Sequence, residues 1–559
     1  MHMNKKMLPI GISDFKTLIE RNYYYADKSL LIKELLDSGA AATLIPRPRR
    51  FGKTLNLSLL QYFFEKTDES NAHLFKDMAI AKHSKCMEHQ GKYPVIFMTF
   101  KDVKVSSWSE CWDAIKKIIS AEFKRHDYLL ESNIFKGNEK VSFQEICNET
   151  AQLVHYSSSL VDLSAYLIRF YKQKPIILID EYDAPIHAGY LNNYYDQVVG
   201  FIRNFLSGGL KDNSNLQFAV MTGILRIAKE SIFSGLNNLK VCSLRDERYS
   251  DKFGLTEAEV KKIVETYHPT IALDDVRDWY DGYMSGSIKM YNPWSIINFA
   301  DTGNLDPYWV NTSDNVLIKQ IIASSSVTFK KDCELLLAGK AVKQEIRDDV
   351  AFPEIKTNAE TLWSFLFLCG YVTFDTVIRE DVSRFSHFSI PNKEVFYLYR
   401  TIIKKWLEEA LSLATYQLML SHLTSGNTVD FKKMFKRFAQ ESLSSFDVGG
   451  KEPEKFYHAL VLGMFANLHT THIIKSNRES GFGRYDVMLI PHDKTKHGIV
   501  IEFKKVDIDD NETLETAAQN ALKQIADKKY VTELETLCIK QIIKLAIVFE
   551  GKDVLVLEG

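Results

Sequence analysis

The 559-residue chain lacks several features that would place it in a specialised class. Its seven cysteines are odd in number and widely spaced, and none form a C-x-x-C pair, which argues against a zinc site and for reduced thiols. No apolar run is long enough to cross a bilayer, and the opening residues, MHMNKKMLPIG, lack the apolar core of a signal peptide. We therefore expect a cytoplasmic protein without a membrane partner.

An excess of charge of one sign is also missing. The 70 lysine and arginine residues nearly balance the 72 aspartate and glutamate residues, and the formal net charge is -2. Overall charge therefore argues neither for nor against a nucleic-acid partner. With 45% hydrophobic and 25% charged residues the composition is that of an ordinary globular protein, and the length predicts about three or four domains.

Short apolar segments alternate with amphipathic segments through the first 250 residues. The strand-like segments are AAATLIPR, YPVIFMTF, KPIILIDEYD, LQFAVMTGIL and LKVCSLRD. Helix-like segments, among them TLNLSLLQYFFEK and SLVDLSAYLIRFYKQ, stand between them. This alternation predicts an α/β domain at 1–250 with a parallel sheet flanked by helices.

The pattern becomes mainly helical in residues 251–430. A capping box, Thr256 to Glu259, opens the first of these helices. Further on, TLWSFLFLCGYVTFDTV and FSIPNKEVFYLYRTIIKKWLEEAL predict a helix, short strands and a second helix, which suits a winged-helix-like module. The aromatic clusters DWYDGY, YNPWSI and PYWVNTS either stack on nucleic-acid bases or, as we favour, anchor the core of this region.

Residues 431–559 change character again. A helix, PEKFYHALVLGMFANL, precedes three strands, THIIKSNRES, GRYDVMLIP and GIVIEFKKV. The helix ETLETAAQNALKQIADKKY and the strand IKLAIVFEGKDVLVL follow. We predict a third domain here, with the order αβββαβ.

The stretch IPRPRRFGKTL, between the first strand and a helix, resembles a phosphate-binding loop that lacks its first glycine. Arg47 stands where the G-x-x-x-x-G-K-[ST] pattern has that glycine, while Gly52, Lys53 and Thr54 match its end. We expect Lys53 to be an exposed ligand of the β- and γ-phosphates and Thr54 to bind Mg²⁺, with extra positive potential from the arginines. The predicted nucleotide-binding residues of the loop are Arg47, Arg49, Arg50, Phe51, Gly52, Lys53, Thr54 and Leu55.

A second motif, IILIDEYD, supports a nucleoside triphosphate site. An apolar strand that ends in two acids is typical of a Walker B strand, with Asp180 on the Mg²⁺ and Glu181 polarising the attacking water. Thr222, at the end of the fourth strand, suits a sensor of the γ-phosphate. Arg226 either contacts the γ-phosphate or a neighbouring subunit of a homo-oligomer, or is an ordinary salt-bridged surface arginine.

With these motifs in place, a family resemblance becomes visible over roughly the first 300 residues. The segments GISDFKTLIERNYYYADKS, RPRRFGKTL, ILIDEYDAPI, MTGILRIAKESIFSGLNNL, DWYDGY and YNPWSI resemble the AAA-ATPase-like family of bacterial P-loop proteins. The resemblance implies that Arg47 belongs to this family's version of the loop. It also implies ATP as the ligand.

A second group of functional residues lies on two strands of the last domain. Glu502 and Lys504, in VIEFKKV, are two apart and therefore share a face of their strand, and the turn through PHDKTKHG brings Asp486 alongside. Two carboxylates, with the carbonyl of Phe503, can hold Mg²⁺ or Mn²⁺, which activates water for attack on phosphorus. The lysine then orients that water or stabilises the developing charge.

This D-x(15)-E-x-K arrangement resembles the PD-(D/E)XK nuclease superfamily and its domains that follow AAA-ATPase-like domains. Gln524 and Tyr530 match the Gln and Tyr on the next helix of related members. Some members also carry a metal-binding Glu on the first helix, where this sequence offers Glu454 near the start and Tyr457-His458 further on. The resemblance implies a metal-dependent deoxyribonuclease with DNA as its partner. The alternative is a non-cleaving switch, in which the ATP state governs partner binding and the nuclease fold only docks DNA.

Overall fold

The computed structural model describes most of the chain and arranges it as two compact units. Residues 1–4, 212, 227–237, 313–317, 319–320, 322–326, 338, 348–349, 351, 356–357, 381–382, 411–412, 444–464, 466–467, 469–470, 481–482, 507–511 and 551–552 are outside the description. The first unit comprises Met1–Ile318 and Lys343–Val395, and the second comprises Lys319–Val342 and Phe396–Gly559. These limits fall at other positions than the boundaries at 250 and 430 that the sequence suggests.

The first unit is built on the parallel five-stranded sheet that the alternation of segments predicts. The strand order is β2-β3-β4-β1-β5, and every pair in it is parallel. The strands are β1 (Ala42–Pro46), β2 (Val95–Thr99), β3 (Ile176–Asp180), β4 (Phe218–Gly223) and β5 (Leu239–Val241). In register, Thr99 pairs with Asp180 and Pro46 with Gly223, so the carboxyl ends of these four strands meet at one edge. That edge is where open α/β sheets bind ligands.

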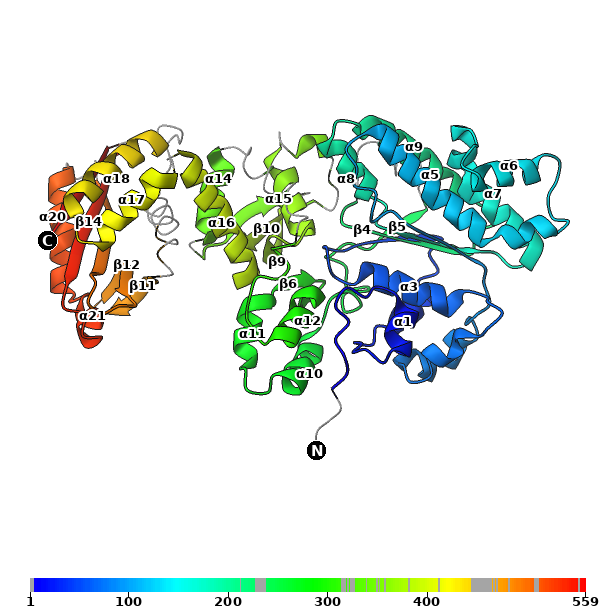
Figure 1. Cartoon of the computed structure of the whole chain (residues 1–559), viewed down its shortest axis with the longest axis horizontal. Helices are drawn as coiled ribbons and strands as arrows, with labels where there is room; N and C mark the ends of the chain where they lie inside the picture. Colours follow the sequence, from blue (N-terminus) through cyan, green and yellow to red (C-terminus); the bar gives the residue numbers. More distant parts are fainter. Residues whose placement is uncertain are drawn as a thin grey trace. The chain divides into compact units, whose positions relative to one another are not determined.

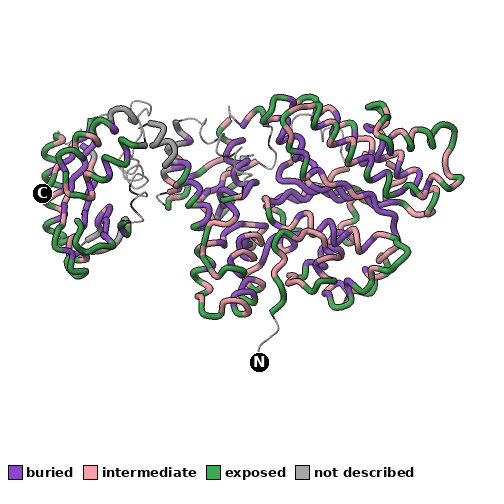
Figure 2. The backbone as a smooth tube through the Cα atoms, in the orientation of Figure 1, coloured by how far each residue is buried: buried purple, intermediate pink, exposed green. Residues whose placement is uncertain are grey.

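Helices cover both faces of this sheet. Figure 1 shows α5, α7 and α9 on one side of the strands and α1 and α3 on the other. Figure 2 shows that the buried residues of this unit follow the strands between these layers. The helices up to β5 are α1 (Phe15–Glu20), α2 (Leu30–Ser38), α3 (Lys53–Phe64), α4 (Ser84–Met87), α5 (Trp108–Arg125), α6 (Glu139–Cys147), α7 (Leu153–Tyr171), α8 (Ala184–Leu191) and α9 (Tyr195–Leu210).

A helical region follows within the same unit. Its elements are α10 (Glu257–Tyr267), α11 (Leu273–Tyr280), the hairpin β6 (Tyr283–Ser285) and β7 (Ile288–Met290), and α12 (Pro293–Thr302). The capping box at the start of α10 is present as predicted, because Thr256 and Glu259 exchange side-chain to backbone hydrogen bonds. The two helices α10 and α12 share one apolar core, which includes Val260, Ile263, Ile296 and Phe299.

The remainder of the first unit has the predicted order of helix, strands and helix. Helix α15 (Ala359–Leu368) precedes β9 (Thr373–Glu380) and β10 (Ser383–Ser389), and α16 (Lys393–Ala410) begins there. With β8 (Val342–Glu345) these strands form a three-stranded sheet in the order β8-β10-β9. The aromatic clusters serve mainly as core, since Tyr280, Tyr291 and Trp309 are buried. Trp294, in contrast, is only half-buried.

The second unit contains a mixed five-stranded sheet in the order β11-β12-β13-β14-β15, in which only β13 and β14 run parallel. The strands are β11 (His472–Ser480), β12 (Gly483–Pro491), β13 (Gly498–Lys505), β14 (Ile542–Glu550) and β15 (Asp553–Glu558). The single final strand expected from IKLAIVFEGKDVLVL is wrong: the segment forms two antiparallel strands, with Glu550 paired to Asp553. A two-residue connection is the usual spacing of a tight hairpin.

Helices cover both faces of this second sheet. Helices α17 (Leu413–Thr424) and α18 (Thr428–Leu443) pack on one face, against Val487, Ile501 and other residues of the same parity. Helix α20 (Leu514–Asp527) packs on the opposite face, against Val500 and Val548, with α21 (Thr532–Thr536) beside it. Helix α14 (Val327–Leu337) also belongs to this unit. The helix predicted at 453–468, which carries Glu454, Tyr457 and His458, lies almost entirely outside the described residues.

Among the residues that the structure describes, no helix is both long enough and apolar enough to span a membrane.

Candidate functional sites

The loop between β1 and α3 curls tightly at the carboxyl edge of the first sheet. Strand β1 ends at Pro46, and α3 begins at Lys53, directly after Gly52. Gly52 has φ 81° and Arg50 has φ 67°, both in the left-handed region. This backbone turn is the reason for glycine at position 52, since a side chain there would be strained although space is available. The turn presents the N-terminus of α3, a natural anion site, at the ligand-binding edge.

Arg47 has a different place from the one expected. Its side chain is fully buried, and Nη1 donates hydrogen bonds to the carbonyl oxygens of Pro46 (2.8 Å) and Cys242 (2.9 Å). The guanidinium also lies over the ring of Phe253, 5.4 Å from its centroid. Burial lowers the pKa of Arg47 to about 10, so the group stays charged at neutral pH. We therefore infer that the Arg47 side chain holds the loop in place from its buried side.

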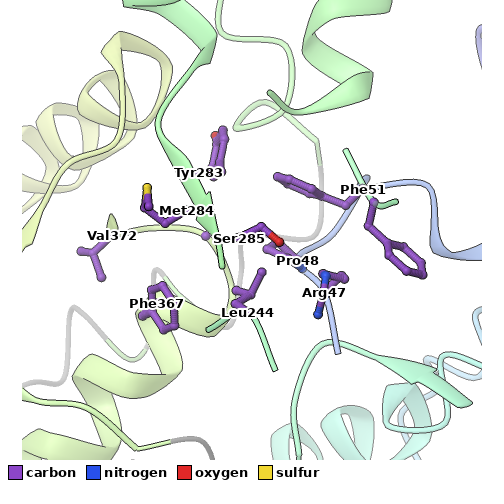
Figure 3. A pocket seen from close by; sticks show the side chains of 11 residues that line it. Arg47, Pro48, Phe51, Leu244, Tyr283, Met284, Ser285, Phe367 and Val372 are labelled. Atoms are coloured by element: carbon purple, nitrogen blue, oxygen red, sulfur yellow. The ribbon is translucent and has the colours of Figure 1, made fainter. Parts of the chain in front are cut away.

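A small cavity of ≈ 10 Å³ lies behind the loop. Figure 3 shows Arg47, Pro48 and Phe51 around it, with Tyr283 from β6 and Phe367 from α15. The Phe51 ring is buried and contacts Tyr283 edge-on at 5.3 Å. Phe51 therefore contributes packing to the loop, and the rear surface of the loop rests on apolar side chains.

Lys53 lies inside the loop. The expectation that it is exposed is wrong, because only 3% of its surface is accessible. The loop curls over its ammonium group, which donates to the carbonyl oxygens of Arg47 (3.2 Å) and Pro48 (3.0 Å). The same nitrogen is 3.9 Å from a carboxylate oxygen of Glu181 and borders the main cleft. Lys53 is thus a preorganised cation at the helix N-terminus.

The motifs of the loop and of β3 meet at Asp180. This carboxylate is fully buried and accepts hydrogen bonds from the hydroxyls of Thr54 (2.7 Å) and Thr222 (2.7 Å). A third hydroxyl, that of Thr99, donates to it at 3.1 Å. Strand β4 lies between β1 and β3, which explains why Thr222 at its end reaches Asp180. The Thr54 and Asp180 oxygens fit Mg²⁺, which takes oxygen ligands and retains water.

Glu181 follows Asp180 in a strained conformation with φ 47°. Its backbone N–H faces the Thr222 hydroxyl at 3.4 Å, and its side chain borders the cleft. Burial raises the pKa of Glu181 above its ordinary value; the neighbouring Asp180 adds to this rise, whereas Lys53 opposes it. A carboxylate with a raised pKa is a better proton acceptor, as general-base catalysis requires.

Asp183 connects the end of β3 with the turn after β4. Its Oδ2 accepts hydrogen bonds from the backbone N–H groups of Ile224 (2.8 Å) and Leu225 (3.0 Å). Burial alone would raise the pKa of Asp183, but the His187 imidazole, whose Nε2 lies 3.3 Å from Oδ2, and the hydrogen bonds from this turn hold it below its ordinary value. Arg226 follows this turn, and its carbonyl oxygen accepts a hydrogen bond from the backbone N–H of Val350 at 3.1 Å. Arg226 is not among the described residues that line the cleft above Lys53.

The cleft above Lys53 has a volume of ≈ 440 Å³. Its basic residues are Arg49, Arg50, Lys53, Lys101 and Lys104. The Arg50 guanidinium stacks on the ring of Trp294, 4.4 Å from its centroid. Thr54, Leu55 and Glu181 also line the cleft, together with the segment 9–13. The sequence analysis did not predict five features of this cleft: Thr99, Lys101, Lys104, Trp294 and the segment 9–13. Of these, only Thr99 could have been recognised from its neighbours in sequence, because it stands at the end of an apolar strand.

The second site lies where β12 and β13 part. The antiparallel register pairs Val487 with Ile501, and the next step along it places Asp486 opposite Glu502. Asp486 Oδ2 accepts the backbone N–H of Phe503 at 2.8 Å, so this carboxylate is bound to β13. Glu502 is buried, and Lys504, two positions further on the same strand, is half-buried. Asp486, Glu502 and Lys504 thus lie on adjoining strands, as the sequence predicts.

Helix α20 supplies further polar groups to this site. Gln524 Nε2 donates to the Glu502 carboxylate, and it lies 3.2 Å from the Tyr530 hydroxyl. Burial raises the pKa of Tyr530, and the charges of Glu502 and Asp486 add to the rise. Of the two residues matched to the superfamily on resemblance, Gln524 therefore contacts Glu502 directly, and Tyr530 contacts Gln524.

The donor set of the second site fits a hard divalent cation. Two carboxylates on adjoining strands are enough for Mg²⁺, which commonly keeps several waters. Among the residues that the structure describes, no cluster of three or more His, Cys, Asp or Glu side chains has metal-binding geometry. The Phe503 carbonyl remains an expected ligand, and Glu454 lies outside the described part of the chain.

Two parts of the chain match known protein families. Residues 9–233 match the family model described as predicted AAA-ATPase, and residues 452–559 match the model of the PD-(D/E)XK nuclease superfamily. The chain is also 24% identical over 536 residues to an uncharacterized protein in the vnfD 5' region of Azotobacter chroococcum mcd 1, covering 94% of this chain and 93% of that protein. The chain therefore carries an AAA-ATPase-like domain in residues 9–233 and a PD-(D/E)XK nuclease superfamily domain in residues 452–559.

Proposed function

We propose that this protein is an ATP-dependent DNA-processing enzyme, in which the ATPase domain controls or positions a Mg²⁺-dependent nuclease domain. The observation that carries the proposal is the contact of Thr54 and Thr222 with the Asp180 carboxylate, each at 2.7 Å. The ends of β3 and β4 and the start of α3 meet there, and the Lys53 ammonium group lies in the same loop. Burying a carboxylate costs free energy, and this one lies at the edge of the sheet where ligands bind, which supports a functional role for it.

For ATP hydrolysis, each residue receives a distinct role. The N-terminus of α3 and the Lys53 ammonium bind the β- and γ-phosphates, while Thr54 and Asp180 hold Mg²⁺, which neutralises phosphate charge when bound. Glu181 accepts a proton from a water molecule while the oxygen of that water attacks the γ-phosphorus, and ADP leaves. Thr222 keeps Asp180 and the backbone of Glu181 in register during this step.

For the nuclease, Asp486, Glu502 and the Phe503 carbonyl hold Mg²⁺ or Mn²⁺, which activates water for attack on a phosphodiester when bound. Gln524 orients the Glu502 carboxylate through its hydrogen bond. Lys504 stabilises the negative charge that develops on the phosphate. DNA is the proposed substrate, and a homo-oligomer in which Arg226 reaches a neighbouring ATP site is one arrangement consistent with this scheme.

The alternative function is a switch that binds DNA or protein according to its ATP state and does not cleave. One observation favours it: the described residues supply two carboxylates to the C-terminal site and no third side-chain ligand. In that case Asp486 and Glu502 serve chiefly to fix β12, β13 and α20 through the hydrogen bonds that they already accept.

The decisive experiment incubates supercoiled plasmid with the full-length protein, with and without ATP and Mg²⁺. We expect nicking by the wild type and at least a hundredfold loss in Glu502→Ala, with ATPase activity retained. Glu550→Ala is the matched control, because Glu550 is an exposed acid on the next strand. The switch would be supported if the wild type and Glu502→Ala both bind DNA and either nick it to the same extent or do not nick it at all. The same assay on RNA tests the choice of substrate.

A further inference from the structure

The first turn of helix α12 contacts the phosphate-binding loop. Asn292, the N-cap of this helix, is fully buried, and its Nδ2 donates a hydrogen bond to the Arg49 carbonyl at 3.4 Å. Its Oδ1 accepts the backbone N–H groups of Trp294 (2.9 Å) and Ser295 (3.4 Å), as N-cap residues do. The Trp294 ring in turn carries the Arg50 guanidinium, 4.4 Å from its centroid. The loop and the start of α12 are therefore joined twice.

The same turn of α12 also contacts the start of helix α16. The Ser295 side chain is fully buried, and its hydroxyl donates a hydrogen bond to a carboxylate oxygen of Glu394 at 2.8 Å. The other oxygen of that carboxylate accepts the backbone N–H of Trp309 at 2.5 Å. Glu394 is the second residue of α16 and is itself fully buried. Because Trp294 and Ser295 are neighbours in sequence, one helical turn meets the loop through one residue and α16 through the next.

Glu394 is a buried acid that neither of the proposed reactions uses. Burial raises its pKa to about 7, although the hydrogen bonds from Ser295 and from the Trp309 N–H lower it. An acid in the first turn of a helix is favoured by the helix dipole, but a solvent-exposed carboxylate would serve that purpose without the cost of burial. The burial and the two hydrogen bonds therefore indicate that Glu394 fixes the start of α16 to α12.

Helix α16 leads from the first unit into the second. The helix is continuous over Lys393–Ala410, and the division between the two units falls between Val395 and Phe396. Both hydrogen-bond partners of Glu394 belong to the first unit, and most of the helix belongs to the second, which carries the domain of the nuclease superfamily. Because helix formation is cooperative, a contact that stabilises the first turn of α16 also favours the turns that follow it.

We propose that Ser295 and Glu394 are positioning residues that couple the nucleotide cleft to α16, so that a nucleotide bound at Lys53 stabilises the helix that leads into the second unit. The inference rests on the proposed function, because the coupling requires a nucleotide in the cleft. Bound phosphates order the loop, the loop holds the first turn of α12 through Asn292, and that turn holds Glu394. No large displacement is needed, since a ligand that orders one part of a contiguous set of contacts lowers the cost of ordering the rest.

The test measures hydrogen–deuterium exchange of the backbone amides of residues 397–402 in the full-length protein. Exchange is followed with Mg²⁺, in the presence and absence of a non-hydrolysable β,γ-imido analogue of ATP, and isothermal titration measures the affinity of the analogue.

Ser295→Ala removes the hydroxyl that joins α12 to α16, and Glu394→Ala removes the carboxylate. Glu394→Gln is the conservative variant, because its amide can accept the Trp309 N–H and donate to the Ser295 hydroxyl. Lys393→Ala is the matched control, since it removes an exposed ion pair with Asp278 (3.0 Å) at the same helix start. Thermal melting shows whether each variant folds, and Ser295→Ala decides the question if Glu394→Ala does not.

We expect the analogue to slow exchange of these amides by about fivefold or more in the wild type, in Glu394→Gln and in Lys393→Ala. In Ser295→Ala and Glu394→Ala the ratio of the two exchange rates should fall below about twofold, while the analogue binds within about threefold of its wild-type affinity. A purely structural role would speed exchange equally with and without the analogue and leave the ratio unchanged. That result, or no slowing in a wild type that has bound the analogue, would overturn the proposal. If the wild type does not bind the analogue at all, the proposed function itself is wrong.

Discussion

The Thr54 hydroxyl donates a hydrogen bond to Asp180 across 126 residues of sequence, at 2.7 Å. The two residues belong to different motifs, one on the loop after β1 and one at the end of β3. Their contact follows from the parallel sheet, which brings the carboxyl ends of its strands to one edge. It makes the phosphate-binding loop and the acidic strand one site, and the first two predictions address it.

Lys53→Ala should abolish ATP binding, with a loss of at least a hundredfold in affinity, because the cation at the start of α3 disappears. Because Lys53 is buried and bonded to the Arg47 and Pro48 carbonyls, we also expect a loss of roughly 1–2 kcal/mol in unfolding free energy. Isothermal titration and thermal melting measure the two effects. Unchanged ATP affinity in a folded variant contradicts the loop assignment.

Glu181→Gln should bind ATP normally and hydrolyse it at least a hundredfold more slowly, because only the proton acceptor is lost. The wild-type rate should rise with pH through the pKa of Glu181, since the base works only when ionised. Burial raises that pKa in the free protein, so the acidic limb of the kcat/KM profile, which reports the free enzyme, should lie above the ordinary glutamate value. An acidic limb at or below that value, or a wild-type rate in the variant, excludes Glu181 from this role.

Arg47→Ala should destabilise the protein by about 2–4 kcal/mol, since it leaves buried carbonyls unpaired and a void behind the loop. Arg50→Ala is the matched comparison: Arg50 is exposed on the same loop and faces the cleft. That variant should keep its melting temperature and lose about threefold to tenfold in ATP affinity. The reverse pattern would mean that the two arginines have exchanged roles.

Mn²⁺ should bind the C-terminal site without ATP, because Asp486 and Glu502 lie opposite each other and a divalent cation relieves their repulsion. Glu502→Ala should remove one ATP-independent Mn²⁺ site in titration of the full-length chain, while Glu550→Ala should keep it. The titration uses the full-length chain. A C-terminal fragment that starts at Asp430 would lack α17 and interrupt α18, whose side chains fill one core of this unit. Identical Mn²⁺ titrations for wild type and Glu502→Ala would remove the metal from the proposed mechanism.

The residues that the sequence identified well are those whose chemistry is local. Gly52, Lys53 and Thr54 lie between a strand and a helix, and Asp180 ends an apolar strand, so parallel-sheet geometry alone brings them together. Asp486 and Glu502 are similar, since one antiparallel turn places their strands side by side. In each case the short sequence pattern and the sheet together determine the position.

Other features depend on contacts that no short pattern encodes. The burial of Arg47 depends on carbonyls that come almost 200 residues later, at Cys242. Trp294 reaches the cleft only because α12 packs in the same unit as the loop. The hairpin of β14 and β15 was missed for another reason: two apolar strands with a two-residue connection look like one long apolar run.

The anchoring of Arg47 has a consequence for the order in which this protein matures. The matched ATPase model ends at residue 233, yet the loop is fastened to the carbonyls of Cys242 and Tyr249, which lie beyond it. A nascent chain that has been synthesised only to the end of the matched segment still lacks these two carbonyl groups. Contacts so distant in sequence form late, because the intervening chain must be ordered first. The proposed nucleotide site is therefore completed only after the chain beyond the matched segment, as far as Tyr249, has joined the fold.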